Sequence, residues 1–543
     1  MRRTLIYTII LAAFGFGCQS PSKKNQFEQP SQVIRISIGD EPQSLDPRKA
    51  RDLNCVTILR MLFEGLTRVN TQEKAELALA DSVEISIDLK TYTFHLRSSV
   101  WSNGDPLTAS DFVYAWKKTL SPNFPSDTAF QLYVIKNAKA AKEGKVSIDA
   151  IGISAIDEHT LKVELENPTP YFLELAAFPT FFPVNRVLDE KNPSWAQNSS
   201  TFVGNGPFQL TEWKHNDRMA VKKNVSYWDA GKVKLDSLVM HMVKGDTELK
   251  MFQKKELDWA GSPLTTLPVD SLESLKATDL LKSKELLGTY FIRTNVERPP
   301  FNHPSMRKAF ALAINRQAII DHVTQGNQIP ATGLVPISLG LQKEPYFKDG
   351  NVEEAKRLFN EGMAALNLSR DHFPEVSLLY AASGRNHLIA QAVQQQWFET
   401  FGIRVKLESM EGKVYFDRIS KQDYHMATGS WIADFEDPIN FLEVFKFKTS
   451  GSNNTLWENA QYAALLTRSS QVVYPEERRE LLAASEKILV DEMPLIPIFY
   501  YTMLYVYQPM VKDVVLSSMG VMDFKWASLA DGGEKAIVQG EGK

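Results

Sequence analysis

The most informative stretch of the chain reads Thr91-Tyr92-Thr93-Phe94-His95-Leu96-Arg97 and, three residues later, Trp101-Ser102-Asn103-Gly104-Asp105-Pro106. In its first half, apolar and polar residues alternate, which predicts a strand with one buried face. Its second half has the Asn, Gly and Pro residues of a turn. Thr108 then caps a predicted helix over 109–120, with Asp111 favourably placed in the first turn.

The same patterns extend in both directions from this unit. They predict strands over 33–38, 159–165, 287–295, 376–380, 403–408 and 495–501, and helices over 56–66, 303–320, 352–360, 388–401 and 476–491. The strand, helix and strand between 376 and 408 are typical of an α/β unit. No repeat of fixed length is present. The sequence therefore predicts an α/β fold.

Composition narrows the class of protein. The chain has 543 residues, of which 43% are hydrophobic and 23% charged, as in ordinary globular proteins of two or three domains. Its formal net charge of −4 and the lack of a long basic run argue against a nucleic-acid partner.

No enzyme motif was found. The chain has no nucleophile elbow, no phosphate-binding loop and no cysteine pairs at metal spacing. Gly204-Asn205-Gly206-Pro207 is better interpreted as a tight turn than as a dinucleotide fingerprint, since Pro207 cannot donate an amide. We therefore expect no catalytic residue, no metal and no cofactor.

The N-terminus predicts export. A basic start, an apolar run and Gly15-Phe16-Gly17-Cys18 have the order of a signal peptide. We expect a signal peptide over 1–17, acylation of Cys18, and a flexible tether over 18–32 that anchors the protein on the periplasmic side of a membrane. The alternative is an ordinary signal peptide with Cys18 incidental. Cys55 then has no disulfide partner, and we interpret it as a buried small apolar residue.

Nine landmarks in order resemble the solute-binding family that includes the oligopeptide-binding proteins of ABC importers. Besides the stretch at 91–116, they include Glu41-Pro42-x-Ser44-Leu45-Asp46-Pro47, Leu62-Phe63-Glu64-Gly65-Leu66-Thr67, Asn205-Gly206-Pro207-Phe208, Asn224-x-x-Tyr227-Trp228-Asp229, Trp431-x-Ala433-Asp434-Phe435-x-Asp437-Pro438 and Pro497-Ile498-Phe499-Tyr500-Tyr501. The resemblance covers essentially the whole chain after the signal peptide.

The resemblance implies a two-lobed periplasmic-binding-protein fold of type II, in its large three-domain form, with a hinge and a ligand cleft between the lobes. Lobe I would comprise 33–63, 201–286 and 511–543, an additional domain II would comprise 64–200, and lobe II would comprise 287–510. Ligand closes the lobes about the hinge, and the transporter distinguishes the two states. The implied partners are short peptides and ABC transporter permease subunits, and we expect a monomer.

The resemblance also implies which residues bind a peptide. A buried ammonium needs a carboxylate partner, and the aspartate of the family's Trp-x-Ala-Asp-aromatic motif is Asp434 here; alternatively, Asp434 only caps a turn before Pro438. Main-chain groups would pair with the peptide backbone as an added strand. The remaining candidates are Thr428, Ser430 and Ile432 for this pairing, Leu53 from lobe I, and Trp431 and Tyr500 as walls of the pocket.

The partner of the peptide carboxylate is open. Thr428 stands where well-known oligopeptide binders have an arginine, and Gly412 where they have a tryptophan. Arg418, Arg385 and His387 are the candidates that remain. Peptide length and side-chain preference do not follow from the sequence.

Three other functions are compatible with parts of the sequence. Relatives in the family carry nickel chelates, opines, sugars or cell-wall peptides, so the ligand class has alternatives. A receptor for a signalling peptide need not transport it. A hydrolase in the same cleft lacks a visible nucleophile and base. Asp434 favours a ligand with a free amino group.

Overall fold

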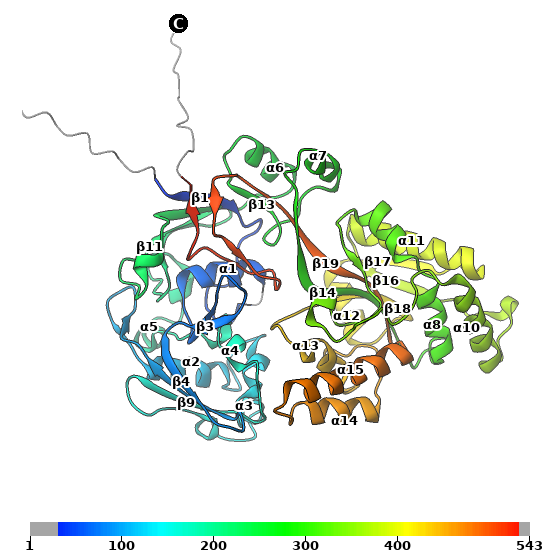
Figure 1. The fold of residues 1–543 in the computed structure, drawn as a ribbon, viewed down its shortest axis with the longest axis horizontal. Helices are drawn as coiled ribbons and strands as arrows, with labels where there is room; N and C mark the ends of the chain where they lie inside the picture. The colour runs from blue at the N-terminus through cyan, green and yellow to red at the C-terminus, as the bar shows by residue number, and fades with distance from the viewer. Residues whose placement is uncertain (1–30, 51, 531–543) are drawn as a thin grey trace, which may run out of the picture. The chain divides into compact units, whose positions relative to one another are not determined.

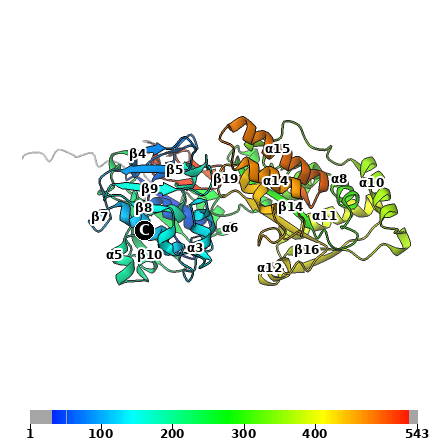
Figure 2. The same ribbon diagram turned by 90° about the horizontal axis from the view of Figure 1, so that it is seen from below.

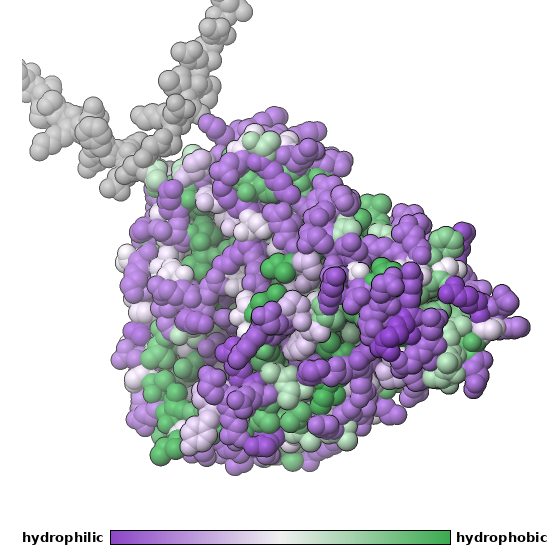
Figure 3. Space-filling view, turned by 45° about the vertical axis from the view of Figure 1, so that its right-hand side comes forward, coloured by the Kyte–Doolittle hydropathy of each residue, from purple (hydrophilic) through white to green (hydrophobic). Residues whose placement is uncertain are grey.

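The computed structural model describes residues 31–50 and 52–530. The expected signal peptide, Cys18, nearly all of the tether and residues 531–543 lie outside the described residues. No described helix has both the length and the apolar character needed to cross a bilayer. On the face in Figure 3, hydrophilic side chains predominate and apolar ones occur in small groups.

A mixed sheet of eleven strands organises the described chain (Figure 1). Ten of the strands follow one another in the order β10 (Phe208–Lys214), β11 (Arg218–Lys223), β12 (Ser237–His241), β1 (Val33–Ser37), β13 (Trp259–Gly261), β19 (Leu495–Tyr507), β14 (Lys282–Thr294), β18 (Met426–Ile432), β16 (Ser377–Ala381) and β17 (Lys406–Met410), and β15 (Ile329–Pro330) pairs with β19. The predicted α/β unit is confirmed, because β16 and β17 are parallel and joined by α11 (Gly384–Phe401).

Two long strands carry the chain from one part of this sheet to the other. β14 and β19, both labelled in Figure 2, pair with each other over most of their length. β19 also pairs with β13. Their register shifts between Glu285 and Thr289, opposite Tyr501. Both strands are longer than the sequence predicts. β14 begins earlier, in the polar run Lys282-Ser283-Lys284-Glu285, and β19 continues through a mostly apolar run to Tyr507.

The alternating residues from Thr91 to Leu96 form one strand of a separate four-stranded sheet. Its order is β4 (Ala80–Ile85), β5 (Thr91–Leu96), β9 (Thr160–Glu164) and β8 (Ile153–Ala155), with α2 (Ala109–Thr119) after the turn. The expected helix start is confirmed: the Asp111 carboxylate accepts the Thr108 N–H at 2.9 Å. One face of β5 is buried, as the alternation predicts.

Two predicted helices have different limits in the structure. The helix expected over 56–66 is α1 (Leu53–Leu62), because Asp52 caps it by accepting the Cys55 N–H at 2.8 Å. The helix expected over 303–320 is divided into α8 (Pro304–Leu312) and α9 (Arg316–Ile319). Asn315 caps α9, and the buried Arg316 donates to the Pro497 carbonyl at 2.7 Å. Hydrophobic spacing alone does not reveal such a break.

Cys55 is buried and unpaired, as expected. Burial, with the nearby Asp52 charge, raises the pKa of its thiol to about 12. The thiol is therefore protonated at neutral pH and is not reactive.

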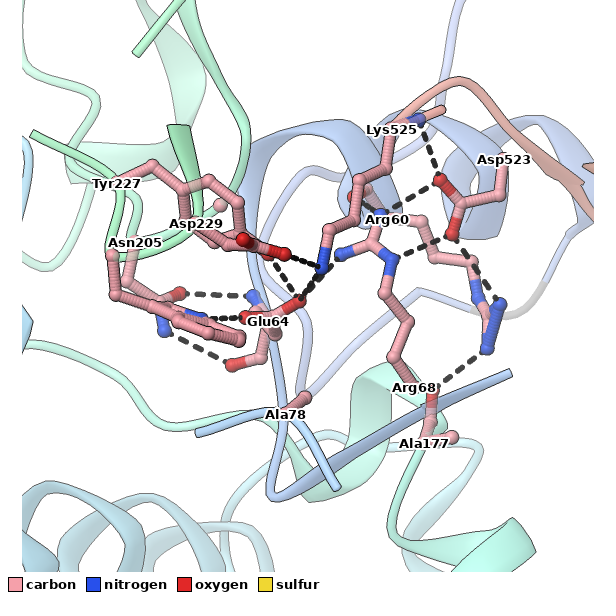
Figure 4. Close-up of polar contacts among 12 residues, drawn as sticks. Arg60, Glu64, Arg68, Ala78, Ala177, Asn205, Tyr227, Asp229, Asp523 and Lys525 are labelled. Atoms are coloured by element: carbon pink, nitrogen blue, oxygen red, sulfur yellow. Dashed lines mark hydrogen bonds and ion pairs between the residues drawn. The ribbon is translucent and has the colours of Figure 1, made fainter. Parts of the chain in front are cut away.

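A buried charge network ties the first and last segments of the described chain together (Figure 4). Arg68 Nε lies 2.7 Å from the Asp523 carboxylate, and Arg68 Nη1 lies 3.0 Å from Glu64. Lys525 Nζ lies 2.9 Å from Asp229, and the Tyr227 hydroxyl donates to Glu64 at 2.6 Å. We call these five charged residues the buried charge network: Glu64 and Arg68, from the segment expected as domain II, and Asp229, Asp523 and Lys525, from the segments expected as lobe I.

Candidate functional site

One edge of β18 is open where the sequence predicts peptide pairing. β18 pairs with β14 along its whole length, but with β16 only at Met426 and Ala427. From Thr428 onward, β18 therefore has no strand on its second side among the described residues. An unpaired edge of this kind accepts an added strand.

The direction of the main-chain groups on β18 follows from one hydrogen bond. The Ala433 N–H donates to the Leu287 carbonyl of β14 at 2.8 Å. Because these groups alternate along an antiparallel strand, Thr428, Ser430 and Ile432 point to the open side. The Thr428 carbonyl is occupied by the Tyr415 hydroxyl. The exposed Ser430 and Ile432 keep main-chain groups that a ligand can use.

Asp434 follows directly after this edge. Its N–H donates to Asn440 Oδ1 at 3.2 Å, and the half-buried Trp431 donates its indole N–H to the same oxygen at 2.8 Å. Asn440 thus fixes the loop. Trp431 shares this acceptor with Asp434 and so helps to position Asp434, in addition to its expected place in the pocket wall.

The Asp434 carboxylate lacks a counter-ion. Burial raises its pKa, and hydrogen bonding from the side chains of Asn440 and Gln131 opposes only part of that rise. Asp434 forms no ion pair within the part of the chain that the structure describes. A carboxylate with poor solvation and no cation attracts a positively charged ligand group.

Leu53 comes to the same region from α1. An ideal Cβ on Gly520 would lie 3.2 Å from Leu53 and 3.0 Å from Leu286 of β14. Leu286 is two residues before Gly288, which pairs with Ile432. Gly520 therefore permits the close approach of the lobe I candidate to the hinge strand beside β18.

Tyr500 does not face this region. Its side chain is 1% exposed, and its hydroxyl donates to the Gly333 carbonyl at 3.2 Å inside lobe II. The adjacent Tyr501 points to the opposite face of β19 and lies 3.2 Å from an ideal Cβ on Gly288, next to Ile432. Tyr501 therefore replaces Tyr500 in the candidate site. The alternation of the strand shows that only one of them faces the site, but the sequence does not say which.

The three candidates for binding the peptide carboxylate differ in how far their side chains already contact other residues. Arg418 is paired with Glu408 at 2.6 Å and with Asp423 at 3.4 Å. His387 contacts the Tyr380 hydroxyl at 2.6 Å through Nδ1. Arg385 is exposed. Burial raises the pKa of Tyr501 to about 12, and the charge of Arg385 acts in the opposite direction on the same pKa. Arg385 is thus the cation with the clearest relation to the site.

Sequence reasoning missed three residues beside Asp434: Asn440, Gln131 and Tyr171. Asn440 lies only six positions after Asp434 and resembles an ordinary helix residue. Gln131 and Tyr171 come from a distant segment, and no spacing relates them to Asp434. The described residues contain no cluster of three His, Cys, Asp or Glu side chains that could hold a metal ion.

Comparison with known proteins agrees with this geometry. Residues 74–453 match the family described as bacterial extracellular solute-binding proteins, family 5 Middle. The chain is 43% identical to the oligopeptide-binding protein OppA of Bacillus subtilis, covering 96% of this chain and 97% of that protein. It is 36% identical to the dipeptide-binding protein DppE of the same organism, covering 91% of each.

A solved structure confirms the expected fold. The Haemophilus influenzae OppA complex with RPPGFSPFR superposes with a TM-score of 0.77 at 28% identity, covering 92% of this chain and 99% of that one. The two-lobed fold of type II is therefore present here. With the family match, the identities and this superposition in agreement, the chain belongs to the family 5 bacterial extracellular solute-binding proteins.

Proposed function

We propose that this protein captures short peptides outside the cytoplasmic membrane and delivers them to the permease subunits of an ABC importer. One observation carries the proposal: Asp434, a poorly solvated carboxylate with no ion pair among the described residues, lies at the end of the open edge of β18. A peptide offers both complements, an ammonium and a backbone. The relatives named for oligopeptide and dipeptide binding support this ligand class.

The peptide lies along β18 in this proposal. Its ammonium meets Asp434, and its backbone pairs with Ser430 and Ile432 from lobe II and with Leu53 from lobe I. Tyr501 forms a wall near Gly288, and Arg385 is the first candidate for the peptide carboxylate. Backbone pairing gives affinity for many sequences, which suits a transporter of mixed peptides.

The domain division and the membrane anchor belong to the same proposal. The two boundaries expected between lobe I and lobe II, at 286/287 and 510/511, fall within β14 and just after β19. Closure about these strands brings lobe I and domain II onto β18. Acylated Cys18 holds the monomer at the membrane; mass spectrometry of the protein made in its own cells measures the acyl groups. The protein carries ligand and catalyses no reaction.

Isothermal titration of the protein without its first 17 residues tests the proposal. The panel contains peptides of two to six residues, each with a free and an N-acetylated amino terminus. We expect Asp434→Asn to weaken binding of the free-amino peptides about 30-fold or more, because a buried ammonium then lacks its partner. The N-acetylated peptides should be affected much less.

Two results would contradict the proposal. Equal affinity of wild type and Asp434→Asn for free-amino peptides would remove the role of Asp434. A metal chelate or a sugar found by mass spectrometry in the natively purified protein would change the ligand class. Asp417→Asn is the matched control for loss of one carboxylate, because its exposed side chain pairs with Lys421, four positions later.

A further inference from the structure

Tyr171 lies in the segment assigned to domain II, yet its ring contacts the loop of lobe II that carries Asp434. The ring of Tyr171 stacks on that of Phe435, with centroids 4.5 Å apart and planes at 7°. Phe435 is the residue after Asp434. This contact thus joins two domains directly beside the proposed ammonium site.

Lobe II forms a slot around the Tyr171 ring. The guanidinium of Arg478, from α15 (Pro475–Glu492), lies 5.7 Å from the ring centroid. Asp437 holds this guanidinium through two hydrogen bonds of 2.7 and 2.9 Å. Phe435 on the motif loop and Arg478 on the helix therefore both contact Tyr171, and a fixed cation near an aromatic ring is attractive.

Tyr171 is held firmly on its own domain. It directly precedes α4 (Phe172–Leu175), and the Thr67 hydroxyl donates to the Leu173 carbonyl of that helix at 2.6 Å. Phe172 packs on Tyr92 of β5, with ring centroids 4.8 Å apart. Tyr171 is half-buried, and this burial raises the pKa of its phenol. A rigid aromatic side chain entering a slot needs little ordering when the contact forms.

We propose that Tyr171 is the closing contact of the ligand site: its insertion between Phe435 and Arg478 holds domain II against the Asp434 loop and slows release of bound peptide. The proposal rests on the peptide-binding function above. Tyr171 is a positioning residue here, because it acts through the loop and not on the ligand. Its effect is therefore the same for every peptide, whatever its sequence.

Release kinetics of Tyr171→Ala test this role. We expect the dissociation rate to rise about tenfold, as for loss of one buried aromatic pair, and the association rate to change less than twofold, since the contact forms after capture. The factor should be equal across the peptide panel. Tyr171→Phe keeps the ring and should release peptide at the wild-type rate. Ile156→Ala, at a 61% exposed apolar residue assigned to the same domain, is the control.

A double-mutant cycle identifies the partner. Tyr171→Ala and Phe435→Leu should be clearly non-additive in their effects on the dissociation rate. An unchanged rate in Tyr171→Ala, additive effects, or equal losses in Tyr171→Phe and Tyr171→Ala would each overturn the proposal. Thermal unfolding of each variant separates these results from loss of fold.

Ligand-free protein separates this proposal from the peptide function. A fluorescent pair on domain II and lobe II should report a smaller closed population in Tyr171→Ala than in wild type. If the wild type binds no peptide but this population still falls, the peptide function fails and the closing contact stands. If peptides bind and neither the population nor the release rate changes, only the closing contact fails.

Discussion

Two buried polar regions of this molecule are built in opposite ways. In the buried charge network, each carboxylate has a cation within an ion-pair distance, and Glu64 also accepts hydrogen bonds from Tyr227 and Trp228. At the Tyr171 contact, Glu174 Oε2 is buried without a hydrogen-bond partner among the described residues. Burial and the nearby Glu436 and Asp437 charges raise the pKa of Glu174.

The difference indicates which contact is permanent. Buried charges that stay together need complete pairing, because each unpaired charge costs several kcal/mol. A contact that opens when ligand leaves returns its carboxylates to water, so unfavourable groups on it limit closure without destabilising either domain. We therefore expect substitutions in the network to change folding stability and substitutions at the Tyr171 contact to change ligand release.

The largest effect is expected for Arg68→Met. It leaves Asp523 and Glu64 buried with less positive charge, and we expect the free energy of unfolding to fall by about 3–5 kcal/mol. Urea denaturation measures this change. Arg186→Met, which removes an exposed pair with Glu190, should change stability by less than about 0.5 kcal/mol. A loss below about 1 kcal/mol in Arg68→Met would remove the contrast between the two regions.

Glu174→Gln should have a smaller effect, and a favourable one: it should strengthen peptide binding. It removes a carboxylate whose Oε2 has no hydrogen-bond partner among the described residues and whose charge is opposed by Glu436 and Asp437, so we expect peptide affinity at pH 8 to increase about threefold to tenfold, or ~1 kcal/mol. The folding stability should change little. Titration calorimetry and urea denaturation together check both parts of this expectation.

The gain in peptide affinity from Glu174→Gln should depend on pH. Because the pKa of Glu174 is raised in the closed contact, its ionised form opposes closure above its ordinary pKa, and protonation removes that cost. The advantage of Glu174→Gln over wild type should therefore shrink as the pH falls from 8 to 5. An advantage that grows on acidification would contradict this account of the contact.

Lys74→Ala should have the smallest effect. Lys74 lies 3.8 Å from Glu436, and its side chain is 70% exposed. Exposed ion pairs contribute about 0–1 kcal/mol and are screened by salt. We expect peptide affinity to fall less than threefold at low salt and not at all at 0.5 M salt; a larger, salt-independent loss would place Lys74 in the closing contact itself.

Much of the fold was predictable because its signals are local. The alternation at 91–97 and the Thr108–Asp111 helix start both depend on residues within a few positions of each other, and both are confirmed. The break between α8 and α9 was not predictable, since it depends on Arg316 reaching the distant Pro497 carbonyl. On β18, the main-chain groups of Ser430 and Ile432 point to the open edge, whereas the Thr428 carbonyl accepts the Tyr415 hydroxyl.

The candidate site was predictable only in part for the same reason. Asp434 stands in a motif that the family shares. Tyr171 and Gln131 have no motif, and only the folded chain brings them near Asp434. Tyr500 was preferred to Tyr501 because sequence gives the alternation of a strand but not its absolute orientation.

The pairing of Arg68 with Asp523, 455 positions later, has a consequence for biosynthesis. The early basic and acidic side chains of the network are made long before their late partners. A nascent chain therefore cannot complete this network, which joins the segments expected as domain II and lobe I, until translation has passed Lys525. A nonsense mutation shortly before Asp523 would spare every proposed ligand contact and still leave the first-made lobe unfinished.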